Sequence, residues 1–125
     1  MKLVSSNIEG DKHWETILPF LEREKPDVLC IQEVFEDDLS KLANYPHRLF
    51  QPNIMKPHTR GGDLMKFGVA TFSTLPFLTE DAPYYVANTP ELPVQDTTNE
   101  KTTHETYWRG YIRIDVEHDD AVYRI

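Results

Sequence analysis

An unbroken apolar run, VLCI at residues 28–31, leads directly into Gln32 and Glu33. A strand with one face in water alternates apolar and polar residues, whereas a continuous apolar run is typical of a strand covered on both faces, usually in a parallel sheet. The run therefore predicts a buried strand in an α/β fold. It also raises the question of why such a strand ends on a carboxylate.

A first strand and a helix are predicted ahead of this run. Residues 2–8 (KLVSSNI) are compatible with a short strand, and residues 9–25 place four apolar side chains on one helical face. These four are Trp14, Ile17, Leu18 and Leu21. Asp11 is the predicted N-cap, and Pro19 is predicted to kink the helix. Strand, helix and strand within about 30 residues predict a βαβ unit with a right-handed crossover.

The rest of the chain predicts further strands, one short helix and two loops. The patterns indicate a helix at 35–44, an edge strand at 45–53, a loop at 54–64, a strand at 65–73, a surface loop at 86–105, and a hairpin of 107–117 and 122–125. Gly68 is predicted to lie at a close-packed point of its strand. A loop as long as 86–105 is usually functional or disordered.

Charge and composition limit the classes of protein to which the chain can belong. It has 125 residues, about one domain, and 21 acidic against 13 basic residues give a net charge of −8. Sequence-independent affinity for nucleic acid comes from basic groups that displace counterions, so we expect no strong general nucleic-acid binder. No segment approaches the roughly 20 apolar residues of a membrane span, and no apolar leader is present at the N-terminus. The single cysteine, Cys30, is expected to be a buried thiol, and these features favour a cytoplasmic protein.

The carboxyl ends of the two predicted parallel strands are expected to meet at one edge of the sheet. Asn7 ends the first strand and Glu33 the second, and neighbouring strands lie about 4.8 Å apart. Open α/β sheets bind ligands outside these ends, and Mg²⁺ is commonly held by one or two carboxylates together with waters and phosphate oxygens. Geometry alone leaves two interpretations open, a magnesium site or ordinary solvated strand ends.

Three segments carry a family resemblance. Residues 5–10 (SSNIEG) fit the pattern S-x-N-[ILV]-x-G, and residues 26–33 (PDVLCIQE) fit P-D-[IVL]-[LIV]-x-[LI]-Q-E. The strand GVATFS at 68–73, followed by a Leu-Pro pair, fits a third pattern. In order and spacing, these segments resemble the opening of the endonuclease/exonuclease/phosphatase superfamily, which includes the pancreatic-type deoxyribonucleases. The chain departs from the family at Ser6, where an aromatic residue often stands.

The resemblance implies a fold, a chemistry and site residues. The fold is α/β, part of a four-layer sandwich of two packed mixed sheets flanked by helices, as in deoxyribonuclease. The reaction is hydrolysis of a phosphate ester with Mg²⁺, or Mn²⁺ in its place. Glu33 and Asn7 are the implied catalytic and metal-site residues, with Glu33 as the ligand and Asn7 in the phosphate and nucleophile site. Arg109 is a candidate substrate contact, with a solvated strand face as the alternative. The substrate stays open among nucleic acid, phospholipid headgroup and inositol phosphate.

The family's later motifs, an Asp-x-Asn and a final Asp-His, have no counterpart in the sequence. Two weak look-alikes, GGDLM at 61–65 and EHDD at 117–120, are expected not to be catalytic. The remaining histidines show no metal-ligand spacing: His13, His47, His58 and His104. We therefore expect residues 1–125 to be the N-terminal part of one truncated domain, inactive alone, and a monomer unless an open strand edge pairs with another copy. The alternative is a non-catalytic interaction or binding module on a degenerate form of the fold.

Overall fold

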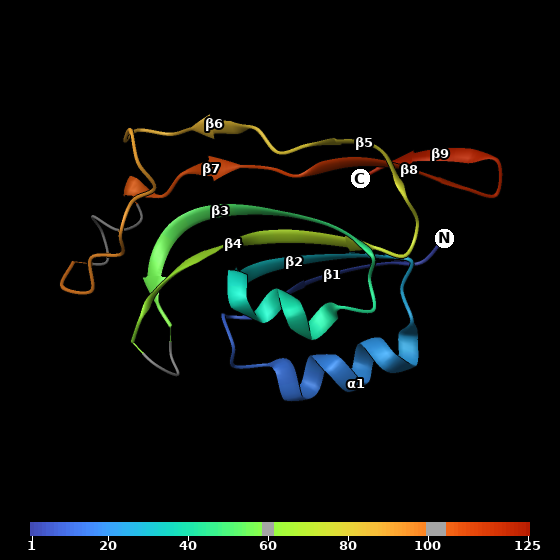
Figure 1. Cartoon of the computed structure of the whole chain (residues 1–125), viewed down its shortest axis with the longest axis horizontal. Coiled ribbons are helices and arrows are strands. Elements are labelled where there is room, and N and C mark those ends of the chain that lie inside the picture. Colours follow the sequence, from blue (N-terminus) through green and yellow to red (C-terminus); the bar gives the residue numbers. More distant parts are fainter. Residues whose placement is uncertain (59–61, 100–104) are drawn as a thin grey trace.

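The computed structural model describes residues 1–58, 62–99 and 105–125, and its elements lie in three layers (Figure 1). The helix α1 and the 3-10 helix η1 lie on one face of a four-stranded sheet, and strands β5 to β9 lie over its other face. The stacked strand layers, with helices outside the first of them, agree with the deoxyribonuclease-like α/β sandwich that the sequence predicts.

The first sheet holds β1 (Leu3–Asn7), β2 (Val28–Phe35), β4 (Leu64–Ser73) and β3 (His47–Pro57), in that spatial order. β1 runs parallel to β2, and β4 runs antiparallel to both β2 and β3. The parallel pair confirms the strand order of the predicted βαβ unit. Gly68 of β4 is close-packed as predicted, because an added Cβ would lie 2.0 Å from the carbonyl oxygen of Gln51 on β3.

The helices α1 (Trp14–Glu24) and η1 (Glu36–Leu42) cover the lower face of this sheet. Their buried side chains share one core with β2 and β4: Trp14, Leu21, Leu39, Leu42, Leu29, Ile31, Val34, Ala70 and Phe72. Within the described ranges, no helix is both long enough and apolar enough to cross a membrane.

The two ends of α1 differ in their capping. The helix begins after His13, which makes no side-chain capping hydrogen bond, so the predicted N-cap at Asp11 is wrong. Residues 9–13 form turns before the helix starts, because the chain must first leave the sheet. At the other end, Lys25 is left-handed and its N–H donates to the Leu21 carbonyl oxygen at 2.8 Å, which closes the helix. Pro19 lies inside the helix, and the kink there stays a prediction.

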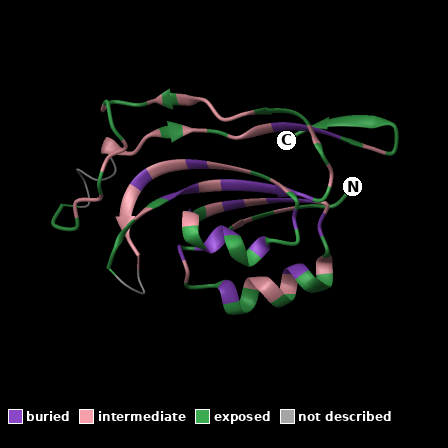
Figure 2. Cartoon of the chain, viewed as in Figure 1, coloured by how far each residue is buried: buried purple, intermediate pink, exposed green. Residues whose placement is uncertain are grey.

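The second strand layer holds a three-stranded sheet and a separate strand pair. The sheet contains β5 (Phe77–Asp81), β8 (Arg113–His118) and β9 (Ala121–Arg124), and the pair contains β6 (Tyr84–Val86) and β7 (Arg109–Gly110). Ile114 and Val116 pack on Val28 of the first sheet. β8 and β9 confirm the predicted hairpin, but its first strand is shorter than the predicted 107–117, because β8 begins at Arg113 and Arg109–Gly110 pairs with β6 instead. All four residues of β9 are exposed (Figure 2).

The predicted loop at 54–64 is wrong in part, because β3 continues to Pro57 and β4 begins at Leu64. β3 contains Pro52 and Pro57, and it is an edge strand, where a missing N–H need not cost a ladder hydrogen bond. A bulge between Pro52 and Ile54 keeps Ile54 fully buried. In the predicted loop at 86–105, the described residues 87–99 form one isolated bridge, from Val94 to Met55, and residues 100–104 lie outside the described ranges.

Candidate functional site

The structure brings Asn7 and Glu33 into direct contact. Asn7 is the last residue of β1 and pairs in register with Gln32 of β2. Its Nδ2 donates a hydrogen bond to Oε1 of Glu33 at 2.8 Å. Both side chains are exposed to solvent. The expected meeting of an amide and a carboxylate at this edge is therefore present, while their catalytic role stays a prediction.

Glu33 does not end its strand, as the sequence suggested, because β2 continues to Phe35. The register against β4 shifts between Gln32 and Val34, so Glu33 is the extra residue of a β-bulge. Its φ is +58°, in the left-handed region that glycine favours. For a residue such as glutamate this backbone conformation costs about 1–2 kcal/mol. Glu33 nevertheless adopts it in the folded chain.

The bulge decides which way Glu33 points. In a regular strand, residues three positions apart face opposite sides of the sheet, yet Ile31 and Val34 both belong to the core under the helices. Phe35 belongs to a separate core cluster with Phe67. The extra residue resets the alternation, so the apolar neighbours stay buried while the Glu33 carboxylate turns toward Asn7.

The loop after β1 holds both residues in place. The backbone N–H of Glu9 donates to Oδ1 of Asn7 at 2.9 Å, and the N–H of Gly10 donates to the carbonyl oxygen of Glu33 at 2.7 Å. These contacts fix the Asn7 amide with its NH₂ toward Glu33. Gly10 has φ +77°, and an added Cβ would lie 3.0 Å from Cε2 of Phe35, so glycine suits this position both by conformation and by space.

Glu9 lies in the loop after β1, and its carboxylate pairs with other residues of that loop. Lys12 Nζ lies 3.1 Å from the Glu9 carboxylate, and His13 Nε2 lies 3.9 Å from it. The hydrogen bond from Lys12 lowers the pKa of Glu9, with the nearby positive charges acting in the same direction. Glu9 is therefore engaged with residues of its own loop.

An apolar wall stands beside the site. Phe35, Ile54 and Phe67 are buried together, and Tyr107 packs against them. Burial raises the pKa of the Tyr107 phenol, and the negative charge of Glu33 raises it further. Tyr107 was not predicted as a site residue, because it follows the long loop in sequence and belongs to no motif.

The other predicted candidates lie elsewhere or stay untested. Arg109 is exposed on β7, where it pairs in register with Val86, and its contact with substrate stays a prediction. His118 lies at the hairpin turn, 3.0 Å from the Asp119 carboxylate. His47 and His58 pack on aromatic rings, and His104 lies outside the described residues.

The donor set at this edge fits one class of metal better than others. In the described part of the chain, no group of three or more His, Cys, Asp or Glu could hold a metal ion. The residues thus provide no closed structural zinc site. One exposed carboxylate, oriented by an amide, suits Mg²⁺, which keeps several waters and uses one or two carboxylates with substrate phosphates.

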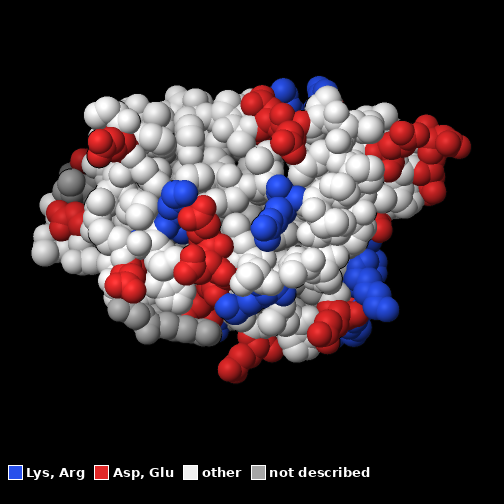
Figure 3. Space-filling view, in the orientation of Figure 1, with Lys and Arg blue, Asp and Glu red and all other residues white. Residues whose placement is uncertain are grey.

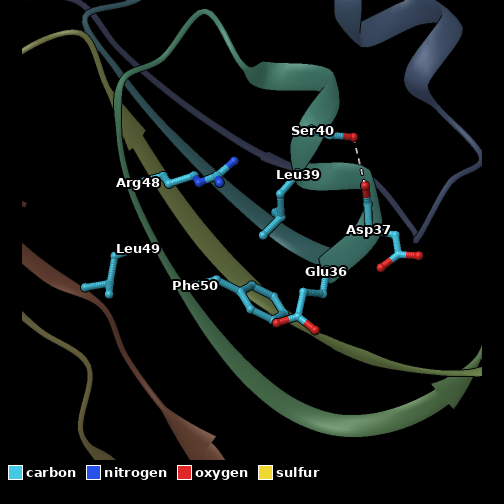
Figure 4. A pocket seen from close by; sticks show the side chains of 7 residues that line it. All are labelled: Glu36, Asp37, Leu39, Ser40, Arg48, Leu49 and Phe50. Carbon is cyan, nitrogen blue, oxygen red and sulfur yellow. Dashed lines mark hydrogen bonds between the residues drawn. The ribbon is translucent and has the colours of Figure 1, made fainter.

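Three hollows between described residues are lined by side chains other than those of Asn7 and Glu33. A pocket of about 390 Å³ lies between η1 and the start of β3, where Arg48 stands near Leu39 and Ser40 (Figure 4). A smaller one of about 190 Å³ lies between the strand layers and includes Gln32, the register partner of Asn7. On the face in Figure 3, Lys and Arg appear in small groups among Asp and Glu. Asn7 and Glu33, by contrast, lie exposed at one edge of the first sheet.

Comparisons with known proteins agree with the fold and the motifs. The sequence model described as Endonuclease/Exonuclease/phosphatase family matches residues 4–123. An endonuclease/exonuclease/phosphatase family protein from Leptotrichia buccalis has a similar structure, with a TM-score of 0.62 and 14% identity over 99% of this chain and 52% of its own. The crystal structure of endonuclease/exonuclease/phosphatase from Beutenbergia cavernae gives a TM-score of 0.55 and 17% identity over 86% of this chain and 31% of its own.

The chain therefore spans about half the length of the first of these structures and about a third of the second. A search of the curated proteins gave no match. The family match extends over nearly all of the sequence and includes both Asn7 and Glu33. This chain belongs to the endonuclease/exonuclease/phosphatase family.

Proposed function

We propose that this protein takes part in the metal-dependent hydrolysis of phosphate esters, with Glu33 as a metal ligand and Asn7 as its partner. The observation that carries the proposal is the 2.8 Å contact between them, made from a bulge in which Glu33 adopts a left-handed backbone. Strained residues of this kind gather at functional sites, where the surrounding structure holds them. Family membership supports a phosphoesterase or nuclease type of hydrolase.

Each residue has a distinct task in this proposal. A carboxylate oxygen accepts hydrogen bonds, and Asn7 donates to one oxygen of Glu33, so this contact also orients the other oxygen. Asn7 has two N–H groups on Nδ2, and only one of them has an acceptor among the described residues, so the other can donate to a phosphate oxygen or orient a water. Bound Mg²⁺ or Mn²⁺ would supply Lewis-acid stabilisation of charge on the phosphoryl group. Asn7 and Glu33 would together align the ester for attack by water.

Binding of Mn²⁺ to the chain tests the proposal. Mn²⁺ should broaden the NMR signals of the Asn7 side-chain amide and of the backbone amides of residues 8–10 before other signals. Glu33→Gln should abolish this broadening, because it removes the charge but keeps the volume and an acceptor for Asn7. Glu22→Gln, an exposed change on α1, is the matched control and should leave the broadening intact.

A non-catalytic interaction module gives a different result in this experiment. Its spectrum would broaden without preference for residues 7–10, and Glu33→Gln would behave like Glu22→Gln. That outcome would defeat the proposed function.

A further inference from the structure

A pocket of about 430 Å³ lies at the other end of the first sheet from Asn7 and Glu33. It is lined by the last turn of α1, by the segment from α1 to β2, by the segment from η1 to β3, and by Thr74 at the end of β4. Asp27, one of the lining residues, directly precedes β2 and lies six residues before Glu33, or about 20 Å along an extended strand. The pocket is therefore separate from the proposed metal site.

Tyr45 is buried beside this pocket with its hydroxyl unpaired. The residue is only 5% exposed and packs edge to face on Phe72, with ring centroids 6.1 Å apart. Its hydroxyl makes no hydrogen bond within the described ranges, and it is not among the polar atoms that the described core seals from solvent. A buried tyrosine usually finds a partner for its O–H. Because Tyr45 lines the pocket, we expect that partner to come from a ligand.

Asp27 lines the same pocket and is held firmly by its neighbours. Its N–H donates to the Lys2 carbonyl oxygen, and its own carbonyl oxygen accepts from the Thr74 N–H, both at 2.9 Å. Oδ2 accepts from the Lys2 N–H at 2.6 Å, whereas Oδ1 has no donor among the residues that the structure describes. Burial raises the pKa of the Tyr45 phenol, and the negative charge of Asp27 raises it further. Asp27 thus offers one oriented acceptor near the unpaired hydroxyl.

The end of α1 adds further acceptors to the pocket. The carbonyl of Glu22 has no helical donor, because the residue four positions later is Pro26, which lacks an N–H. A helix C-terminus also carries partial negative charge, which favours cations. Lys2 shows this preference at the same helix end, where its Nζ donates to the Glu24 carbonyl oxygen at 2.7 Å. A second ammonium group would meet similar acceptors at Glu22.

The charges and the apolar side chains of the pocket indicate the class of ligand. Glu22 and Asp27 are anions, and Lys25 is the single cation among the described residues that line it. Lys25 is exposed and makes no ion pair in the described part of the chain. Leu21 and Pro26 provide an apolar side. The pocket therefore favours a ligand with positive charge and an apolar body over an anionic one.

We propose that this pocket binds a small organic cation, with its ammonium group near Asp27 and Tyr45 and its apolar body on Leu21 and Pro26. An ammonium group has three donors and no acceptor. Oδ1 of Asp27, the Tyr45 hydroxyl oxygen and an acceptor of Glu22 match these three donors. The site goes beyond the proposed hydrolytic function and does not depend on it.

Titration of the chain with benzylamine, followed by NMR, tests the site. Benzyl alcohol is the neutral counterpart of this probe, and benzoate is the anionic one. Benzylamine should shift the backbone amides of residues 27, 44, 45 and 74 first. It should bind at least about tenfold more tightly than benzyl alcohol, as expected for a hydrogen bond to a charged group. Equal affinity for the amine and the alcohol, tighter binding of benzoate, or no localised shifts would overturn the proposal.

Two variants test the residues that would hold the cation. Asp27→Asn removes the charge but keeps an acceptor for the Lys2 N–H, and it should weaken benzylamine binding about tenfold. Tyr45→Phe should weaken it about three- to tenfold without lowering the thermal midpoint, because the hydroxyl has no partner in the described chain. If Asp27→Asn fails to fold, Tyr45→Phe decides, and unchanged affinity in that variant would overturn the assignment.

Glu15→Gln is the matched control for charge. Glu15 is an exposed residue in the first turn of α1, at the far end of the helix from the pocket. Its substitution should leave benzylamine affinity unchanged, and a loss equal to that of Asp27→Asn would show that net charge alone is responsible. Glu33→Gln should also leave benzylamine binding intact, and Asp27→Asn should leave the Mn²⁺ broadening of Asn7 in place. Failure of one site is therefore distinguishable from failure of the other.

Discussion

Two carboxylates of this chain, Asp115 and Glu33, are held in opposite ways. Asp115 of β8 is buried and accepts two hydrogen bonds from Arg124, at 2.8 and 2.9 Å, and one from Thr79 at 2.8 Å. Glu33 is exposed, accepts one hydrogen bond from Asn7, and sits on a left-handed backbone. Arg124 and Thr79 occupy both oxygens of Asp115, whereas among the described residues only Asn7 donates to the Glu33 carboxylate. We therefore expect Glu33 to bind the metal ion and Asp115 to serve the fold.

The largest expected effect is on kcat/KM, which substitution of Glu33 should lower far more than substitution of Asp115. In a form of the protein that turns over a phosphodiester, Glu33→Gln should lower kcat/KM by at least about 100-fold, because a metal ion contributes several kcal/mol of charge stabilisation. Asp115→Asn should leave kcat/KM within a few-fold at a temperature where the variant is folded. Steady-state kinetics of both variants check this, and equal losses would erase the distinction.

The next effect concerns stability and pH. The hydrogen bonds from Arg124 and Thr79 lower the pKa of Asp115 from its ordinary 3.8 to about 2. The folded state therefore favours the ionised carboxylate, and this stabilisation is complete above pH 4 and lost as the pH falls toward 2. Asp115→Asn should lower the thermal midpoint at neutral pH and remove this part of the acid dependence.

Arg124→Met is the companion variant, because it removes the ion pair between Asp115 and Arg124 by changing the arginine. The two changes together should cost little more than either alone. Thermal scans at pH values from 2 to 7 show whether the losses are shared. Additive losses would mean that Asp115 and Arg124 act separately.

A third effect tests the loop that holds Glu33. Gly10→Ala should cost about 1–2 kcal/mol of unfolding free energy, from the left-handed backbone and the contact with Phe35. It should also weaken Mn²⁺ binding, since the Gly10 N–H holds the Glu33 carbonyl. Gly62→Ala is the control, because Gly62 has φ +73° but nothing within 4 Å of an added Cβ. Denaturant unfolding should show the smaller cost there, with Mn²⁺ binding unchanged.

The smallest expected effect is a difference in unfolding free energy that measures the backbone strain at Glu33. Glu33→Gly should be more stable than Glu33→Gln by about 1 kcal/mol, because glycine adopts φ +58° without a Cβ penalty. Both variants should lose the metal. Equal stability in urea titrations would show that the Glu33 backbone is not strained, and the bulge would then carry no information about function.

The parts of the fold that could be predicted depend on local patterns. The apolar run before Gln32 and the helical spacing around Leu21 specify a parallel strand pair, and parallel strands bring Asn7 close to Glu33. The bulge could not be predicted, because a glutamate gives no sign that it will adopt a left-handed conformation. The continuation of β3 to Pro57 was missed because the proline and the Gly-Gly pair at 61–62 are typical of a loop.

The wall beside the site could not be predicted for a different reason. Ile54 and Tyr107 of this apolar wall are 53 positions apart in sequence, and they come together through tertiary packing. Neither belongs to a motif or to a periodic pattern that points at Glu33. Motifs predicted the residues that orient each other across neighbouring strands, while the surrounding wall required the packed structure.

The most direct test of the metal site is a crystal structure of the chain soaked with Mn²⁺, with data collected to show anomalous scattering. We predict an anomalous peak in contact with a carboxylate oxygen of Glu33, with the Asn7 side chain still bonded to that residue. A peak at Asp115 or at another carboxylate, with none at Glu33, would contradict the assignment of Glu33 as the metal ligand.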